Sequence, residues 1–310
     1  MAIKEFLYRQ KQRLLMVTSN NVTLKNIAEI NFSKKRIDVR RNGFLVHEIQ
    51  FLVPGNFNFL FEPRAFDLFL SNARKLNGTY EVSGNKLIFC FNDLRVAITS
   101  RSELYIINEI FVDKCYQFLL PKNVSVHVVD IGMNVGLASL FFASLPYVDH
   151  VHGYEPFTPT FKQAQENINL NPEQARKIET YNFGLGEKEQ SLMVPYNSDN
   201  KGINASLINS PRVTASHRER LWIKQASESL NVLFQRFPES RFIVKIDAEG
   251  AEYAIFNSLF KNRLSEQVIG VMVEWHFFGP RQLEKLLTEN RFMLVSQSLN
   301  ENGGLIYAFR

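Results

Sequence analysis

The sequence predicts an α/β fold in which a mostly parallel sheet follows a smaller β-rich region. The first observation is a run of buried-type residues at 126–131, mainly Val and Ile, that leads through a Gly-containing turn into an apolar helix at 137–145. The second is the alternation of strand and helix patterns after this run, which is typical of parallel sheets covered by helices. The third is an Asn-Gly-Gly turn between two apolar runs near the C-terminus, which predicts an antiparallel hairpin added at the edge of the sheet. The strands expected beyond the first are 150–154, 178–183, 242–246, 268–273, 292–297 and 305–309.

The N-terminal part differs in charge and in pattern. Residues 1–41 contain ten Lys or Arg against three Asp or Glu, while the whole chain of 310 residues carries a net charge of only +5. Ile3, Phe6, Leu7, Leu14 and Leu15 have helical spacing, and residues 36–100 carry short strand-like runs with turn signals, including a meander at 79–99. We therefore expect two domains: a basic arm with a β-rich cap or substrate region at 1–100, and a ligand-binding domain at 101–310. The basic arm is either a solvated surface or a contact for an anionic partner such as nucleic acid.

Two further helices are expected around the main alternation. Residues 102–120 have an apolar face and include Glu109, and residues 217–236 read as a polar helix after a long irregular segment. The start of the chain lacks the apolar core of a signal peptide, and no apolar stretch is long enough to cross a bilayer. The two cysteines, Cys90 and Cys115, do not make a disulfide framework. These features predict a cytoplasmic protein without a transmembrane segment.

The turn after the first strand of the sheet has the spacing D-x-G-x-N-x-G, formed by Asp130, Gly132, Asn134 and Gly136. Glycines let a ligand approach the backbone, and the following helix N-terminus offers unpaired N–H groups. The dinucleotide fingerprint would have a third glycine, and an acid at the strand end would repel a phosphate. The motif therefore favours a ligand with a cationic end, such as the amino-acid end of S-adenosylmethionine, over a dinucleotide; a tight turn without a ligand is the alternative.

Polar residues stand at the carboxyl ends of the expected strands, where ligands of such sheets bind. They are Asp130, Glu155, Asn182, Asp247, and Glu274 with His276. Glu155 lies at the end of the second strand, where a carboxylate can accept hydrogen bonds from both ribose hydroxyls. Asn182 has the groups to read an adenine edge, or it simply ends a strand.

Several motifs together resemble the FkbM-type S-adenosylmethionine-dependent methyltransferases. They are VVDIGMNVG at 128–136, the Glu155-Pro156 pair, ENINLN at 166–171, KIDAEGAE at 245–252 and VEWH at 273–276, preceded by NEIFVDKCY at 108–116. The resemblance implies a Rossmann-like class I methyltransferase fold over about residues 103–310, with methyl transfer to an oxygen of a small molecule or sugar and S-adenosylhomocysteine as product. It implies cofactor contacts for Glu109, Asp130, Gly132, Met133, Asn134, Gly136, Glu155, Pro156, Phe157 and Asn182.

An oxygen acceptor reacts faster when a nearby group removes its proton. Asp247, Glu249 and His276 follow the fourth and fifth strands and are the catalytic candidates, with His276 or Asp247 as the base. Alternatively, Asp247 holds the cofactor while Glu249 and Glu252 hold loops. Asp247, Glu249 and His276 also have the chemistry to hold a divalent cation that orients a diol, although no fixed ligand spacing supports a metal.

Three other functions remain open on the sequence alone. One is a nucleic-acid methyltransferase, acting on RNA for example, that uses residues 1–41 as a phosphate clamp. Another is a module that binds S-adenosylmethionine without turnover. An NAD-dependent enzyme is disfavoured by the missing third glycine and by Asn134.

Overall fold

The structure is a computed structural model that describes residues 37–40, 43–118, 124–197, 217–261 and 265–310. The chain divides into two compact units, residues 1–113 and 114–310. Most of the basic arm at 1–41, including the expected helix from Ile3 to Leu15, lies outside the described residues. The division by function, into a cap at 1–100 and a cofactor-binding domain at 101–310, stays a prediction.

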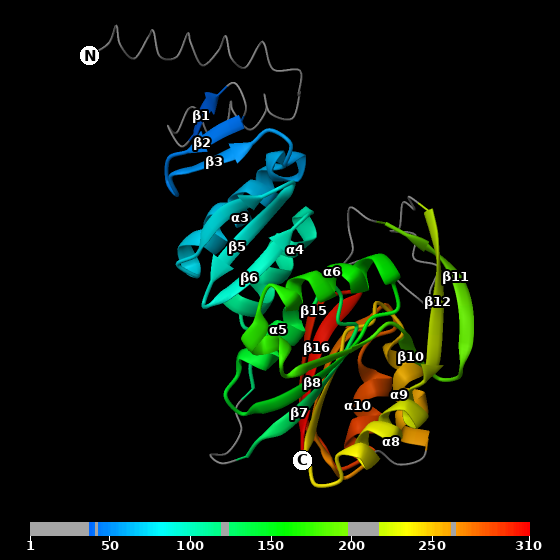
Figure 1. The fold of residues 1–310 in the computed structure, drawn as a ribbon. Coiled ribbons are helices and arrows are strands. Elements are labelled where there is room, and N and C mark those ends of the chain that lie inside the picture. The colour runs from blue at the N-terminus through cyan, green and yellow to red at the C-terminus, as the bar shows by residue number, and fades with distance from the viewer. Residues whose placement is uncertain (1–36, 41–42, 119–123, 198–216, 262–264) are drawn as a thin grey trace, which may run out of the picture. The chain divides into compact units, whose positions relative to one another are not determined.

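The first unit contains two small antiparallel sheets and the helices around them (Figure 1). Its aromatic core includes Phe69, Tyr80 and Phe89, with neighbouring ring centroids 4.0 and 4.5 Å apart. The expected meander at 79–99 is confirmed as one of the sheets. The elements are β1 (Ile37–Arg40), β2 (Gly43–Val46), β3 (Phe51–Pro54), η1 (Asn58–Phe61), α3 (Pro63–Lys75), β4 (Thr79–Ser83), β5 (Lys86–Phe91), β6 (Leu94–Ile98), α4 (Arg101–Ile107) and the π-helical turn η2 (Asn108–Val112).

The second unit is built on a seven-stranded sheet with the order β15-β16-β14-β13-β7-β8-β9. Its strands are β7 (Val126–Ile131), β8 (Val148–Tyr154), β9 (Ile178–Tyr181), β13 (Phe242–Ile246), β14 (Val268–His276), β15 (Met293–Asn300) and β16 (Gly303–Phe309). The first five strands pair in parallel, and β16 alone runs against its neighbours. This is the Rossmann-like methyltransferase fold that the sequence predicts.

Helices cover both faces of this sheet (Figure 1). On one side lie α5 (Leu137–Ser144) and α6 (Thr158–Asn169), followed by the short α7 (Pro172–Ala175). On the other lie α8 (Ala226–Arg236), α9 (Glu252–Lys261) and α10 (Arg281–Glu289). Every residue of β7 and of β13 is buried, which explains their nearly continuous apolar sequences. The two central strands are therefore held on both faces, so the turns that follow them stand on a rigid base.

Two expectations are wrong in detail. The helix expected at 102–120 ends at Val112. The polar helix expected at 217–236 is a strand followed by a helix: β12 (His217–Gln225) pairs with β10 (Gly184–Gly186) and β11 (Gln190–Tyr196), and α8 begins only at Ala226. Leu221 and Ile223 are buried while Trp222 is exposed, which is the two-residue period of a strand. The terminal hairpin is confirmed as an antiparallel addition at the edge of the sheet, with β15 outermost and β16 paired with β14.

In the part of the chain that the structure covers, no helix has the length and apolar character needed to span a membrane. Cys90 and Cys115 are free thiols.

Candidate functional site

The turn between β7 and α5 brings three strand ends together. Gly132 has a φ of +78°, and a Cβ there would stand 1.7 Å from the carbonyl oxygen of Asp247. Asp247 in turn donates its backbone N–H to the carbonyl of Ile131 at 3.0 Å. Gly136 has a φ of +83° and packs against Ala164 of α6. The glycines of the motif are therefore required by contacts within the protein, whatever ligand the turn binds.

Glu155 connects this turn to the next one. Its side chain is buried, one carboxylate oxygen accepts the backbone N–H of Asn134 at 3.0 Å, and the other accepts that of Phe157 at 2.9 Å. Burial raises the pKa of Glu155 to about 7, against the opposing effect of the two backbone N–H groups. Each oxygen keeps a second lone pair, so the carboxylate retains acceptor capacity for a hydroxyl. The residue expected at a ribose is thus fixed at the junction of two strand-end turns.

Asp130 forms a buried ion pair that the sequence argument did not include. Its side chain is fully buried, accepts a hydrogen bond from Ser139 at 2.6 Å, and lies 3.0 Å from the Nζ of Lys245. Lys245 is 2% exposed and also donates to the carbonyl of Gly132 at 2.8 Å. Burial lowers the pKa of Lys245, but the carboxylates of Asp130 and Asp247 outweigh this and raise it. Asp130 therefore has a charge partner within the protein and fixes the turn through Lys245 and Ser139.

The segments that follow β8 and β9 contain three further expected cofactor contacts, Pro156, Phe157 and Asn182. The amide nitrogen of Asn182 donates to the carbonyls of Glu155 and Pro156 at 2.9 and 3.4 Å, and its oxygen accepts from Thr158 at 3.0 Å. Phe157 is buried and its ring lies 5.4 Å from that of Tyr196. The structure thus brings Asn182 to the turn after β8, where its amide ties the two chain segments together.

Two polar features of the first turn take no part in these internal contacts. Asn134 has a φ of +54°, and its side-chain oxygen is buried without a hydrogen-bond partner among the described residues. No side chain caps the N-terminus of α5, so its first N–H groups are not satisfied by a cap. Met133 differs: it is 1% exposed and its sulfur occupies the space above Gly153. The polar groups left at the turn suit a ligand that carries both donors and acceptors.

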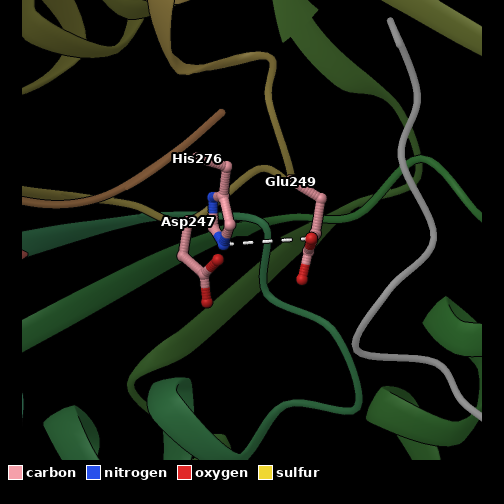
Figure 2. Close-up of side chains that lie close together, drawn as sticks. All are labelled: Asp247, Glu249 and His276. Atoms are coloured by element: carbon pink, nitrogen blue, oxygen red, sulfur yellow. Dashed lines mark ion pairs between the residues drawn. The ribbon is translucent and has the colours of Figure 1, made fainter. Parts of the chain in front are cut away.

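A second group of polar side chains follows β13 and β14. Ligand-type atoms of Asp247, Glu249 and His276 all lie within 4.8 Å of one another, as Figure 2 shows. The Nε2 of His276 stands 3.8 Å from Glu249, and its Nδ1 forms a hydrogen bond of 3.0 Å with Glu252. Asp247 accepts a hydrogen bond from Tyr116 at 3.2 Å. The structure therefore brings all three catalytic candidates together.

The surroundings of His276 set its protonation. Burial lowers its pKa, but the hydrogen bond and the charge of Glu252, together with Asp247 and Glu249, raise it to about 10. An imidazole with this pKa already carries its proton at neutral pH and cannot accept another. Of the two bases that the sequence suggests, the raised pKa of His276 favours Asp247, and the role of Asp247 stays a prediction. Glu249, with a φ of +49°, adopts the left-handed conformation that is uncommon for a non-glycine residue.

Glu109 belongs to the first unit, whereas both groups belong to the second. It lies in η2 of the first unit and its side chain is exposed. Its expected contact with the cofactor stays a prediction.

Sequence reasoning missed two residues that hold the site. One is Lys245 of KIDAEGAE. The other, Asn167 of ENINLN, is buried and donates to the carbonyl of Val135 at 2.8 Å, fixing the turn after β7. Glu252 accepts the backbone N–H groups of Ala248 and Gly250, which is the loop-holding role that the sequence suggests for it as an alternative. The available signal was a charged or amide residue inside an otherwise buried pattern, because such residues are almost always paired.

Comparisons with known proteins agree with this fold and these motifs. The sequence model of the methyltransferase FkbM domain matches residues 130–301, which is more than half of the chain. "Methyltransferase 1" of Beauveria bassiana is 25% identical over 172 residues, which cover 50% of this chain and 66% of that protein, slightly under two thirds of its length. "Methyltransferase sdnD" of Sordaria araneosa is 26% identical over 222 residues, which cover 63% of this chain and 84% of that protein.

Among solved structures, the methyltransferase FkbM from Methylobacillus flagellatus matches with a TM-score of 0.43 and 13% identity, over 79% of this chain and 59% of that one. The family match runs from the end of β7 through β15 and includes both polar groups described above, but it does not include Glu109. The chain belongs to the FkbM methyltransferase family.

Proposed function

We propose that this protein is an S-adenosylmethionine-dependent methyltransferase that methylates a hydroxyl oxygen of a small molecule or a sugar. The observation that carries the proposal is the pair of turns after β7 and β8, joined by Glu155, together with the buried oxygen of Asn134, which has no hydrogen-bond partner within the described parts of the chain. A nucleoside with an amino-acid end offers hydroxyl and ammonium donors to such acceptors, and a carboxylate to the N-terminus of α5.

The residues present fit this cofactor in chemical type. Glu155 would accept the ribose hydroxyls through its remaining lone pairs, and Asn134 would accept a donor of the amino-acid end. Pro156, Phe157 and Asn182 would border the base, while Met133 and Asp130 would shape the turn from behind. Because Asp130 is neutralised by Lys245, the attraction of a cationic ligand would come from the carboxylates after β13 and β14. Glu109 remains a proposed contact from the first unit.

When bound, S-adenosylmethionine would supply a methyl group on a sulfonium; the acceptor oxygen would attack the methyl carbon in line, forming the O–C bond as the S–C bond breaks and S-adenosylhomocysteine leaves. The protein has two tasks in that reaction: to orient the acceptor oxygen and to take its proton. The partly exposed carboxylate of Asp247 would accept the proton, and Tyr116 holds this carboxylate in place through its hydroxyl. The positively charged His276 and the carboxylate of Glu249 would orient the acceptor.

The alternatives keep their tests. Residues 1–41 lie mostly outside the described part, so the nucleic-acid methyltransferase stays an open proposal. Salt-sensitive binding of RNA by the intact chain, lost when these residues are deleted, would favour it. The binding module without turnover would bind the cofactor but methylate nothing in a broad panel of hydroxyl acceptors.

The test is transfer of labelled methyl groups from S-adenosylmethionine to a panel of sugars and small hydroxylated molecules. With any accepted substrate, Asp247→Asn should lower kcat by about 10²-fold or more, because a positioned base contributes 10²–10⁴. The control is Glu173→Gln, which removes the same charge at an exposed position on α7 and should keep the rate. A full rate in Asp247→Asn would exclude Asp247 as the base, and the absence of cofactor binding would refute the proposed function.

A further inference from the structure

The three side chains in Figure 2 differ from a purely acidic cluster because one of them is a histidine. Two carboxylates, from Asp247 and Glu249, face one imidazole nitrogen, that of His276. Oxygen and nitrogen ligands in this mixture suit divalent cations of the manganese, iron and zinc type. His276 ends β14 and Asp247 directly follows β13, so strands support these two residues, while Glu249 lies in the turn that follows Asp247.

The orientation of His276 is an independent observation. The residue is only 7% exposed, and among the described residues the one hydrogen bond of its ring runs from Nδ1 to the fully buried Glu252. The same oxygen of Glu252 accepts the backbone N–H groups of Ala248 and Gly250, so the carboxylate is fixed from three sides. A carboxylate on one nitrogen of a histidine is the usual arrangement behind a metal-binding imidazole, because it fixes the ring and directs the other nitrogen to the metal.

The other nitrogen, Nε2, points into the cluster without a hydrogen bond. The carboxylate oxygens of Glu249 and Glu274 stand 3.8 and 3.7 Å from it, which is beyond hydrogen-bond length. A cation binds nitrogen and oxygen ligands at about 2.1 Å, so two of its ligands lie about 3.0 Å apart at a right angle and about 4.2 Å apart when opposite. The distance of 3.8 Å between the Nε2 of His276 and the carboxylate of Glu249 falls inside this range. The ligand atoms of the cluster all lie within 4.8 Å of one another, so a pair at that limit would have to approach by about half an ångström to bind one cation.

We propose that Asp247, Glu249 and His276 form a divalent-cation site with open coordination positions, in which the cation replaces the proton on the Nε2 of His276. Three protein ligands leave room for water or for a substrate in the coordination sphere, as in catalytic rather than structural metal sites. Glu252 is a positioning residue for His276.

The role of the cation in catalysis rests on the proposed function, whereas its binding does not. A bound cation would lower the pKa of an acceptor hydroxyl and orient it, which would supply part of the activation otherwise assigned to Asp247 alone. An acceptor with two adjacent oxygens, such as a vicinal diol, would occupy two open positions at once.

The test measures binding of Mn²⁺ to the full chain without S-adenosylmethionine, by following the electron paramagnetic resonance signal of free Mn²⁺ in a titration. We expect one saturable site per chain. Glu249→Gln and Asp247→Asn should each weaken binding by at least about tenfold, since even loss of a supporting partner costs that much. Glu173→Gln is the matched control and should bind as the unmodified chain does. Near-UV circular dichroism of each variant establishes that it is folded.

The possible results separate the two proposals. Absence of a saturable site, or a site that both ligand variants leave unchanged, overturns the cation proposal. If S-adenosylhomocysteine still binds by calorimetry in that case, the proposed function stands without a metal. If Mn²⁺ binds at these residues but S-adenosylhomocysteine does not, the cation site stands and the proposed function fails.

Discussion

Replacing Lys245 by Met would remove the cation that balances Asp130 at the centre of the sheet. Lys245 is 2% exposed and its Nζ lies 3.0 Å from Asp130, which has no exposure at all. Breaking a buried ion pair on one side leaves an uncompensated charge, at a cost of about 3–5 kcal/mol. The carbonyl of Gly132 would also lose its donor, so the turn that holds the proposed cofactor would loosen together with the sheet.

The assay is urea unfolding followed by tryptophan fluorescence. The chain has two tryptophans, Trp222 and Trp275, and both belong to the second unit, so the signal reports on the sheet that contains the ion pair. The control is Lys285→Met, which breaks an exposed contact of 3.8 Å with Glu289 and should change stability by less than about 0.5 kcal/mol.

A double variant separates charge from packing. Adding Asp130→Asn to Lys245→Met removes the buried carboxylate as well and should recover a large part of the lost stability, because replacing both partners costs less than removing one. If Lys245→Met unfolds at nearly the same urea concentration as Lys285→Met, the ion pair does not hold the turn and the reasoning is refuted.

Three other outcomes follow from the geometry. Gly132→Ala should destabilise the second unit by at least about 2 kcal/mol more than Gly279→Ala in thermal melts, because both have similar positive φ but only Gly132 meets a backbone oxygen; equal shifts would contradict this. Burial lowers the pKa of His152 to about 4, so the folded state resists a proton that the unfolded chain takes up near pH 6.5, and stability should fall with decreasing pH, by ~2 kcal/mol at pH 5. The urea midpoint of His152→Phe should then depend less on pH between 7 and 5, and parallel curves would exclude the effect. Glu155→Gln leaves one of two backbone N–H groups without an acceptor and should cost about 1–3 kcal/mol by the same fluorescence assay, whereas an unchanged midpoint would show that these bonds contribute little.

The parallel sheet was predictable because its central strands are buried on both faces. Val126 to Ile131 and Phe242 to Ile246 read as mainly apolar runs that only His127, Asp130 and Lys245 interrupt, and that pattern favours strands buried on both faces. The segment at 217–236 misled the sequence argument because its first half is an antiparallel strand with charged residues on its outer face, which resembles the polar side of a helix. Only the partner strand β11, distant in sequence, decides between the two.

The site was predictable as a set of strand ends but not as a set of contacts. Sequence position placed Asp130, Glu155 and Asp247 at one edge, because parallel strands end on the same side. It did not reveal that Lys245 neutralises Asp130 or that Glu252 holds His276, since both pairings join residues on different strands or loops. Electrostatic roles depend on such distances, and a single sequence carries no distance information.

The central claim is that the turns after β7 and β8 hold the nucleoside of a methyl donor. It is tested most directly by calorimetric titration of S-adenosylhomocysteine into the full chain. Our account predicts saturable binding of one molecule per chain. Titration that gives no heat with S-adenosylhomocysteine or S-adenosylmethionine, while NADH binds to the same protein, would contradict it.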